Sequence, residues 1–566
     1  MHIETVFLKG YRNYRDAVVN LNISTLIIGA NDAGKTNLIN AIRLLLDKSI
    51  SELDLEPKSN DFHCGSRGEV ADELSITLKF IKADKDAVVS KLAGYISDER
   101  VTYISYRALR QDLSYRLYIG HDLNQLEEIN SRFYLKYLSL RYIKSQRDLD
   151  KYINLEKKHL LRLAQENRTK EQIEEDDASL TELNNLLSDV NSKVKDISYV
   201  KAATAELNNE LRKLSYNYER MDIELDSGAI GLDQFIEKLE LSSSSNGYKL
   251  LLGGDGLNNQ ILLALWKSKS VREYDENNEV VIYCIEEPEA HLYPHQQRKL
   301  SNYLTNKLPG QSIVTSHSPQ IAVNYKPDSI VKIYSKQGVS FAASNGCSRC
   351  ISDAWDGMGY RISIIPAEAF FANIIFLVEG PSEEILYRQL AKSLGIDLDY
   401  YNISILSVDG VQFEVYKKIL DAFNIRFVIR TDNDSSKVPN KDEFQYAGLN
   451  RGLQLCNIDG IPNEFLPISK EQLNAKWQQY SQVLNDKGVF ISKVDLEADL
   501  CEEFLNHVKD YTGKDSAEEA ANYLRGKKAI RMRELLALKK DNLAVLGGGE
   551  LVKPLKMVIS IAKGEL

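Results

Sequence analysis

The sequence has few cysteines and no long apolar run, and both absences narrow the class of protein. Six cysteines in 566 residues do not support a disulfide framework. Cys347 and Cys350 form a C-x-x-C pair, but no second pair or nearby histidine completes a zinc site. No apolar stretch approaches the roughly 18 residues of a membrane span, and the first residues contain no secretory apolar core. We therefore expect a cytoplasmic protein with no membrane partner.

The sequence also has no excess of basic charge. Lys and Arg number 71 against 81 Asp and Glu, which gives a net charge of -10. This balance argues against a uniformly basic nucleic-acid binder but allows local basic patches, such as the one in residues 524–540. Hydrophobic residues make up 43% and charged residues 27%, as in globular proteins, and the length fits about three domains.

Short β-like runs alternate with helical stretches in residues 1–145, 226–345 and 346–566. Such alternation predicts α/β domains with parallel sheets. Residues 151–225 differ, because they contain no glycine and no proline and are rich in Glu, Lys, Leu and Asn. We expect this block to be a helical insert.

Apolar residues in the insert follow heptad spacing. One stripe consists of Leu180, Leu183, Leu187, Val190, Val194 and Ile197, and a second of Leu207, Leu211, Leu214, Tyr218, Met221 and Leu225. Two amphipathic helices must bury these stripes against a partner. The pattern fits either a homodimer interface or a helical hairpin that packs on itself, and the architecture favours the dimer.

A glycine-rich loop follows the apolar strand TLIIG. The loop reads Gly29-x-x-x-x-Gly34-Lys35-Thr36 and leads into an amphipathic helix, which is the strand–loop–helix context of a P-loop. Its backbone N–H groups surround phosphate oxygens, Lys35 reaches the β and γ phosphates, and Thr36 binds Mg²⁺. We expect the ATP-binding residues of this loop to be Gly29, Asn31, Gly34, Lys35, Thr36 and Asn37.

Two later strands carry residues that suit the same nucleotide. VVIYCIEEPEAHLYP is an apolar strand that ends in Glu286, which is placed to hold Mg²⁺, and Glu287, which can orient or deprotonate water. QSIVTSHSP begins with a strand that ends at His317, whose imidazole can sense the γ-phosphate.

Acidic residues follow further strands in the last third of the chain. IIFLVEGPSEEIL places Glu379 after a strand and Glu383 on the next helix, and IRFVIRTDND places Asp432 and Asp434 after another. Parallel strands deliver their carboxyl ends to one edge of a sheet. Carboxylates gathered there repel one another unless cations are present, and such oxygen ligands select Mg²⁺ or Mn²⁺.

These motifs carry two resemblances. The P-loop, the EEPEAHLYP segment and the split by a helical insert resemble ABC ATPases of the RecF, Rad50 and SMC type. The E-G and D-x-D pattern is similar to the Toprim domain. Their order resembles the OLD (overcoming lysogenization defect) nuclease family, most of all the nuclease subunit of the Gabija anti-phage system. The expected fold is an α/β chain with the ATPase in residues 1–148 and 227–345, a helical dimerisation insert in 149–226, and Toprim in 346–566.

The resemblance to OLD nucleases implies further roles. An acidic motif like LEADL supplies Glu497, with Asp495 as a further metal ligand, and a later lysine, Lys528 or its neighbour Lys527, stabilises the phosphate. The full expected metal set is Thr36 at the nucleotide and Glu379, Glu383, Asp432, Asp434, Asp495 and Glu497 at a two-ion Toprim site. The expected catalytic residues are Glu379, Asp432, Lys528 and Glu287. The implied activity is ATP-regulated, metal-dependent cleavage of double-stranded DNA by a homotetramer with a UvrD-like helicase partner.

Some features leave alternatives open. Gly253 stands where the ABC signature has serine, and no clear Q-loop glutamine follows the P-loop helix, where NDFH (60–63) is the nearest candidate. Nucleotide binding is therefore better supported than fast hydrolysis. A RecF-like repair ATPase with a non-nucleolytic Toprim scaffold, or an OLD effector of another defence system such as a retron, remain the rival interpretations.

Overall fold

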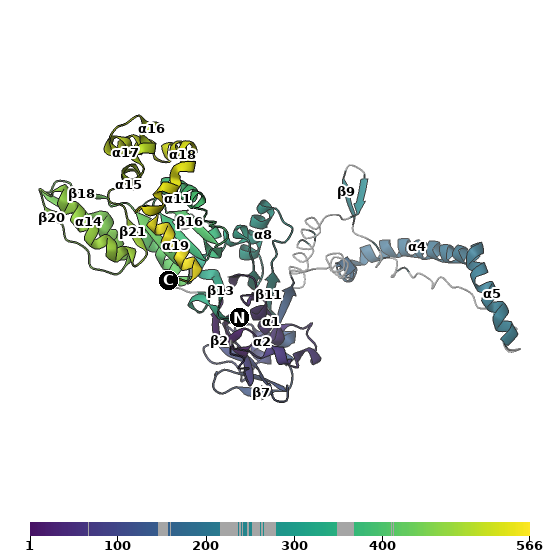
Figure 1. The fold of residues 1–566 in the computed structure, drawn as a ribbon. Helices are drawn as coiled ribbons and strands as arrows, with labels where there is room; N and C mark the ends of the chain where they lie inside the picture. Colours follow the sequence, from purple (N-terminus) through teal and green to yellow (C-terminus); the bar gives the residue numbers. More distant parts are fainter. Residues whose placement is uncertain are drawn as a thin grey trace. The chain divides into compact units, whose positions relative to one another are not determined.

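The computed structural model describes residues 1–144, 279–347 and 367–565 almost completely, together with most of 157–214 and short stretches between 232 and 264. The chain divides into two compact units (Figure 1). The first comprises Met1–Ser145, Asp275–Glu289 and Tyr293–Leu566, and the second Gln146–Tyr274 with Ala290–Leu292. Among the helices of these described residues, none is long and apolar enough to cross a membrane.

The first sheet of unit 1 is antiparallel, with strand order β2-β1-β4-β5-β6-β7. Its strands are β1 (His2–Tyr11), β2 (Tyr14–Asn20), β4 (Glu73–Ile81), β5 (Thr102–Leu109), β6 (Tyr115–Gly120) and β7 (Glu127–Ile129). The prediction of parallel sheets is wrong here. Short turns join β1 to β2 and β5 to β6, and such turns can only connect antiparallel neighbours.

The second sheet has the order β14-β13-β3-β12-β11-β8, and all its pairs except β13–β14 are parallel. Its strands are β3 (Ser24–Ile28), β8 (Leu138–Ile143), β11 (Val280–Glu286), β12 (Gln311–Thr315), β13 (Ile330–Lys336) and β14 (Val339–Ala342). Helices α1 (Lys35–Leu46), α8 (Pro294–Asn306) and α9 (Pro319–Ala322) connect or follow these strands. The parallel prediction is confirmed for this sheet.

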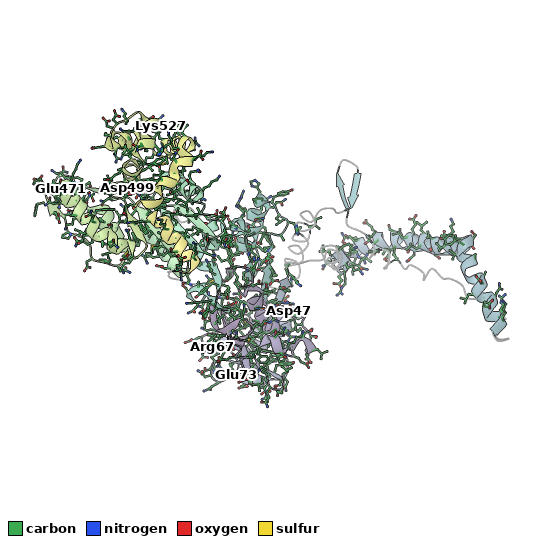
Figure 2. The ribbon with its side chains drawn as sticks, in the orientation of Figure 1. Asp47, Arg67, Glu73, Glu471, Asp499 and Lys527 are labelled. Carbon is green, nitrogen blue, oxygen red and sulfur yellow. The ribbon has the colours of Figure 1, made fainter. Side chains whose placement is uncertain are left out.

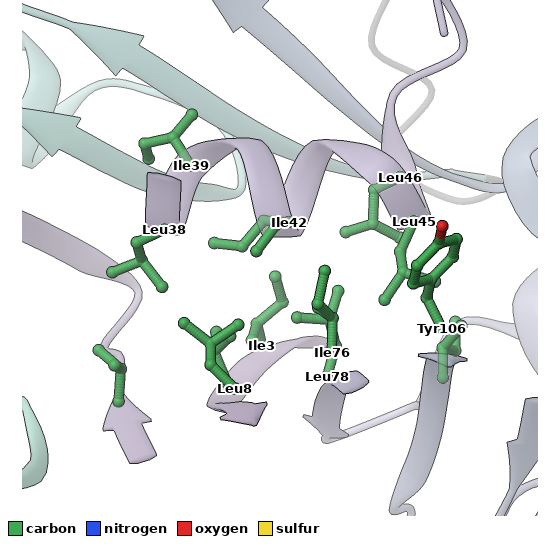
Figure 3. Packing of buried hydrophobic residues seen from close by; sticks show 14 of the residues in the cluster. Ile3, Leu8, Leu38, Ile39, Ile42, Leu45, Leu46, Ile76, Leu78 and Tyr106 are labelled. Atoms are coloured by element: carbon green, nitrogen blue, oxygen red, sulfur yellow. The ribbon is translucent and has the colours of Figure 1, made fainter. Parts of the chain in front are cut away.

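Helix α1 holds the two sheets together through one apolar core. Its residues Leu38, Ile42 and Leu45 recur at helical spacing and are fully buried. Figure 3 shows the helix lying over Ile3, Leu8, Ile76 and Leu78 of the antiparallel sheet. Because this helix begins at Lys35, the same packing fixes the position of the P-loop.

The C-terminal part of unit 1 is built on a parallel sheet with the order β16-β15-β17-β21. Its strands are β15 (Ile374–Val378), β16 (Ile403–Ser407), β17 (Arg426–Thr431) and β21 (Val489–Ile491). A small antiparallel sheet follows β17, made of β18 (Ser435–Lys437), β19 (Glu443–Tyr446) and β20 (Glu464–Phe465).

Helices surround this sheet, and α11 and α15 to α19 share its apolar core. They are α11 (Pro381–Ser393), α12 (Phe413–Ala422), α13 (Ala447–Leu455), α14 (Lys470–Asn485), α15 (Leu496–Glu503), α16 (Leu505–Thr512), α17 (Ala517–Arg525), α18 (Lys528–Lys539) and α19 (Lys553–Lys563). Helix α11 buries Leu386, Tyr387 and Leu390 at successive turns, so its first turn is pinned beside the end of β15.

Unit 2 contains the predicted helical insert. Helix α4 (Lys170–Asp196) begins with a capping box, in which the Thr169 hydroxyl accepts from the N–H of Gln172, and α5 (Ser198–Leu214) follows it. A hairpin of β9 (Ser242–Ser245) and β10 (Tyr248–Leu251) lies later in the unit. The second predicted stripe continues into residues 215–225, and that part lies outside the described residues.

Candidate functional site

The predicted nucleotide residues meet at the carboxyl edge of the second sheet. Strands β3, β12 and β11 are adjacent and parallel, and Thr315 of β12 pairs with both Ile27 and Glu286. The three strands therefore end at the same level. The P-loop follows β3, Glu286 is the last residue of β11 and Glu287 comes directly after it, and His317 follows β12. The structure therefore brings all three motifs together.

Gly29 and Gly34 meet a steric requirement of the P-loop. Their φ angles are +155° and +114°, a region that side chains rarely adopt. A Cβ on Gly29 would lie 2.2 Å from the Ile333 carbonyl oxygen, and one on Gly34 would lie 2.6 Å from the Asn13 Nδ2. The loop thus lies directly against neighbouring chain segments, which only glycine permits.

Lys35 folds over the loop that it follows. Its Nζ donates to the carbonyl oxygens of Gly29 at 2.9 Å and Ala30 at 2.8 Å. Burial lowers the pKa of Lys35, although the nearby acids, Glu287 first, oppose this shift. The amine is therefore a buried cation held within the loop, as phosphate binding requires.

The remaining P-loop residues differ in their surroundings. Asn31 and Thr36 are exposed at the loop. Asn37 is tied down, because its Nδ2 donates to Asn13 Oδ1 at 2.8 Å and its Oδ1 accepts from Arg12 Nη1 at 2.9 Å. Arg12 also pairs with Asp61 of the segment that we considered as a Q-loop, so this segment lies beside the nucleotide site.

The acidic pair at the end of β11 divides into two environments. Glu286 is buried; its Oε2 accepts from the Tyr142 hydroxyl at 2.8 Å, and its Oε1 has no partner. Glu287 has a φ of +43°, and its Oε1 lies 3.3 Å from His317 Nε2. Burial and then Lys35 lower the pKa of His317, which favours the neutral imidazole that can accept or donate.

Sequence reasoning missed Glu289. Its Oε1 accepts from the Ser316 hydroxyl and from the His317 N–H, both at 2.7 Å. This carboxylate fixes the backbone that carries His317. Its position three residues after Glu286 in EEPE was the available signal.

The predicted Toprim acids also meet at one sheet edge. Strands β15 and β17 are adjacent and parallel, with Val378 paired to Arg430. Glu379 and Asp432 are the first residues after these two strands. The third strand end, after β16, contains Asp409, which lies outside the described residues.

Hydrogen bonds hold these two carboxylates in place. Glu379 Oε2 accepts from the Thr431 hydroxyl at 2.8 Å, from the Asp432 N–H at 2.9 Å and from Arg451 Nη1 at 3.3 Å. Asp432 Oδ1 accepts from the Ser492 hydroxyl and the Leu496 N–H, both at 3.1 Å. One oxygen of each carboxylate is thereby positioned by the protein.

Several acidic side chains of this site are buried close to one another. Burial, together with the charges of Glu383 and Glu379, raises the pKa of Asp432 to about 8. Burial raises the pKa of Glu383 to about 7, with Glu379 and Glu497 acting in the same direction. Ionisation of these groups therefore costs free energy unless a cation is bound.

The surroundings of the Glu497 carboxylate favour a role as a metal ligand. It lies on α15 and is 1% exposed, and neither carboxylate oxygen has a hydrogen-bond partner among the residues that the structure describes. Burial raises the pKa of Glu497, while Lys528 acts against this rise. Buried carboxylates are normally paired or coordinated, so two unpartnered oxygens fit a metal ligand.

Of the two candidate lysines, Lys528 is the one on which the acids act. Burial opposes its charge, but Glu497, Asp432 and Glu383 raise the pKa of Lys528 overall. Lys528 begins α18, whereas Lys527, labelled in Figure 2, precedes the helix as its N-cap. The charges of the carboxylates thus stabilise the Lys528 ammonium.

Two nearby acids are bound to arginines. Asp495 caps α15 through the N–H of Ala498 at 2.8 Å and pairs with Arg525 Nε at 2.6 Å. Asp499, labelled in Figure 2, pairs at 2.9 Å with the buried Arg430. The contacts of Asp499 are those of a structural ion pair. Those of Asp495 favour a capping role, and its metal role stays a prediction.

The carboxylates of the predicted ligands suit a divalent metal, but their oxygens do not point to one common position. Within the described residues, no three His, Cys, Asp or Glu side chains are grouped as a ready cation cage. Asp434 Oδ2 accepts from Arg451 Nη2, and the same guanidinium contacts Glu379. An arginine stands between two of the predicted ligands.

Sequence reasoning missed Arg430, Arg451 and Ser492. Arg430 Nη2 donates to Ser492 Oγ at 2.9 Å, and Ser492 in turn holds Asp432. The second arginine of the strand RFVIRT, which follows three apolar residues, was a signal for Arg430. Nothing local marked Arg451, which reaches the site through the packing of α13.

Comparisons with known proteins agree with this two-part arrangement. Residues 1–322 match the family described as AAA ATPase domain, and residues 370–434 match the overcoming lysogenization defect protein-like TOPRIM domain. The chain is an α/β protein with an ATPase domain followed by a Toprim domain. It belongs to the AAA ATPase domain family and has the AAA–Toprim organisation of the OLD family. Endonuclease GajA of Bacillus cereus (strain VD045) is 26% identical over 568 residues, covering 95% of each chain.

Two solved structures are also similar. The SmcHead bound to the C-winged helix domain of ScpA is 17% identical with a TM-score of 0.38, covering 60% of this chain and 97% of that one. The C-terminal region of the Burkholderia pseudomallei OLD protein is 23% identical with a TM-score of 0.22, covering 34% of this chain and 99% of that one.

Proposed function

We propose that this chain is an ATP-regulated, divalent-metal-dependent DNA endonuclease that acts in bacterial anti-phage defence. The observation that carries the proposal is the buried carboxylate of Glu497, whose oxygens have no hydrogen-bond partner among the described residues. The charge of Lys528 acts on Glu497, and the adjacent ends of β15 and β17 bear Glu379 and Asp432. The likeness to Endonuclease GajA over nearly the whole chain supports DNA as the substrate and a Gabija-type role.

The proposed metal ligands are Glu379, Glu383, Asp432, Asp434 and Glu497, with Asp495 at the margin. Two bound Mg²⁺ or Mn²⁺ ions would supply Lewis-acid stabilisation of the attacking and leaving oxygens of a phosphodiester. The fit rests on the unpartnered oxygens of Glu497 and on the raised pKa values of Asp432 and Glu383.

The protein's own groups have distinct tasks in this mechanism. Ser492 and the Leu496 N–H hold one oxygen of Asp432 and leave the other free to bind. Glu379 is held by Thr431 and helps to orient the attacking water. The Lys528 ammonium neutralises charge that develops on the phosphate oxygens, which is worth most in a buried site.

At the ATPase site, Gly29, Asn31, Gly34, Lys35, Thr36 and Asn37 bind ATP, and Thr36 with Glu286 holds its Mg²⁺. The free Oε1 of Glu286 fits that role. Glu287 and His317 lie within contact of each other and are placed to position water and sense the γ-phosphate. We propose that ATP acts mainly as a bound regulator, with slow hydrolysis.

We further propose that residues 149–226 form a dimerisation insert and that the protein is a tetramer built as a dimer of dimers. Leu183, Val190 and Val194 of the first stripe are exposed, at 40%, 53% and 36%. Exposure of an apolar stripe favours association over a self-packed hairpin. A UvrD-like, GajB-like helicase subunit is the proposed partner.

Cleavage of plasmid DNA tests this function. Purified protein should nick or cut DNA with Mg²⁺ or Mn²⁺, and EDTA should stop it. Glu379→Ala and Asp432→Ala should each lose cleavage by 100-fold or more, since each is to hold the metals. Glu384→Ala is the matched control, because Glu384 lies on α11 and pairs with Arg388 away from the cluster. Cleavage retained in both site variants would leave the RecF-like scaffold as the better interpretation.

A further inference from the structure

Arg451 occupies a place between two proposed metal ligands. Its Nη1 lies 3.3 Å from Glu379 Oε2 and its Nη2 contacts Asp434 Oδ2, so one guanidinium bridges both carboxylates. The Arg451 side chain is only 14% exposed. A planar guanidinium suits such bridging, because its donors form a rigid fork.

The fold delivers this arginine to the site. Arg451 lies on α13, whose N-terminal turn is pressed against the chain just after β17: the Gly448 N–H donates to the Asn433 carbonyl at 2.6 Å. A Cβ on Gly448 would lie 2.2 Å from both the Asp432 and Asn433 carbonyl oxygens. One helical turn further, Gly452 allows the same helix to approach Ile491. Helix packing therefore fixes the backbone of α13, which brings Arg451 within reach of both carboxylates.

We propose that Arg451 is a built-in counter-cation, which neutralises Glu379 and Asp434 in the metal-free protein and leaves them when a divalent cation binds. This inference rests on the proposed metal site. Mutual repulsion of the two carboxylates explains why the metal-free site needs a cation. With the guanidinium in place, both carboxylates already have a cationic partner.

The consequence is a threshold for metal loading. A divalent cation must compete with Arg451, so the site loads at a higher free metal concentration than the carboxylates alone would require. Arg451 thus sets how much free Mg²⁺ or Mn²⁺ the nuclease needs. In the absence of metal, the same bridge prevents the repelling acids from destabilising the fold.

Titration of the full-length protein with MnCl₂, monitored by the EPR signal of free Mn²⁺, tests this proposal without using activity. Arg451→Ala should bind Mn²⁺ about tenfold more tightly than wild type, because charge-assisted hydrogen bonds no longer compete. Arg451→Lys should also bind more tightly than wild type, since an ammonium cannot bridge both carboxylates. Arg388→Ala, which removes a helix ion pair with Glu384, should bind as wild type does.

Thermal unfolding provides the second readout. Arg451→Ala should melt lower than wild type in EDTA and gain more from added Mn²⁺. Unchanged Mn²⁺ affinity in Arg451→Ala would overturn the proposal. So would wild-type affinity in Arg451→Lys, because that result would show a simple effect of charge. If wild type and Arg451→Ala both fail to bind Mn²⁺, it is the proposed metal site that fails.

Discussion

Several acidic residues at the Toprim edge lie in environments where ionisation costs free energy. Glu497 is buried with no hydrogen-bond partner among the described residues, and burial raises the pKa values of Asp432 and Glu383. Buried acidic groups with raised pKa values are concentrated at functional sites, because a fold selected only for stability would neutralise or expose them. The same cost makes the site sensitive to pH.

The stability of the metal-free protein should fall as pH rises from about 4 to about 8. The folded pKa of Asp432 lies near 8 and that of Glu383 near 7, both above their ordinary values, so the folded state binds more protons than the unfolded state in this window. Melting temperatures measured in EDTA between pH 5 and 9 should show this loss. Asp432→Asn should flatten the curve, and equal slopes in both proteins would contradict the assignment.

Residues in short motifs at strand ends lie in the fold where the sequence predicts them, while their roles stay predictions. The P-loop, Glu286, Glu287 and His317 lie at one sheet edge, and Glu379 and Asp432 at another, because parallel strands end at one level. Glu497 lies on helix α15, so no strand end positions it. Sequence reasoning failed for Arg451 and Ser492. Arg451 reaches the site because α13 packs on the Asp432–Asn433 backbone, and no pattern along the chain encodes that approach.

At the scale of elements, the parallel sheets were predictable and the antiparallel one was not. The strand–helix rhythm identified β3, β11, β12 and the Toprim strands. The first sheet followed a different rule, since its strands are joined partly by tight turns, as between β1 and β2. Helix α1 packs against it, so an antiparallel layer positions the P-loop helix.

Helix α4 provides a test of assembly. Leu183 and Val190 lie two turns apart on one exposed apolar face. Replacing both with Glu should lower the mass of the oligomer, because charges at a buried interface cost several kcal/mol. Light scattering measures the mass, and Ser188→Glu on the same helix is the control. A folded double variant with unchanged mass would place the interface elsewhere.

At the scale of the whole molecule, an ATPase domain and a Toprim domain share one chain. A ligand shifts a conformational equilibrium only through its different affinities for the two states. If ATP regulates cleavage, it must favour a state in which DNA does not reach Glu379 and Lys528.

Millimolar ATP should therefore inhibit DNA cleavage by wild type when free Mg²⁺ is held constant. Lys35→Ala should escape this inhibition, because its loop has lost the cation that binds the β and γ phosphates. Holding free Mg²⁺ constant removes chelation as a cause. Equal inhibition of the two proteins would show that the ATPase site does not control cutting.

The claim that the Toprim edge is the metal-dependent nuclease centre is tested most directly by plasmid cleavage with Glu497→Gln. This variant keeps the size of the side chain and removes a buried carboxyl group whose oxygens have no hydrogen-bond partner among the described residues. It should fold at least as stably as wild type in EDTA and yet lose Mg²⁺- or Mn²⁺-dependent cleavage by 100-fold or more. Cleavage at the wild-type rate by a folded Glu497→Gln protein would contradict the claim.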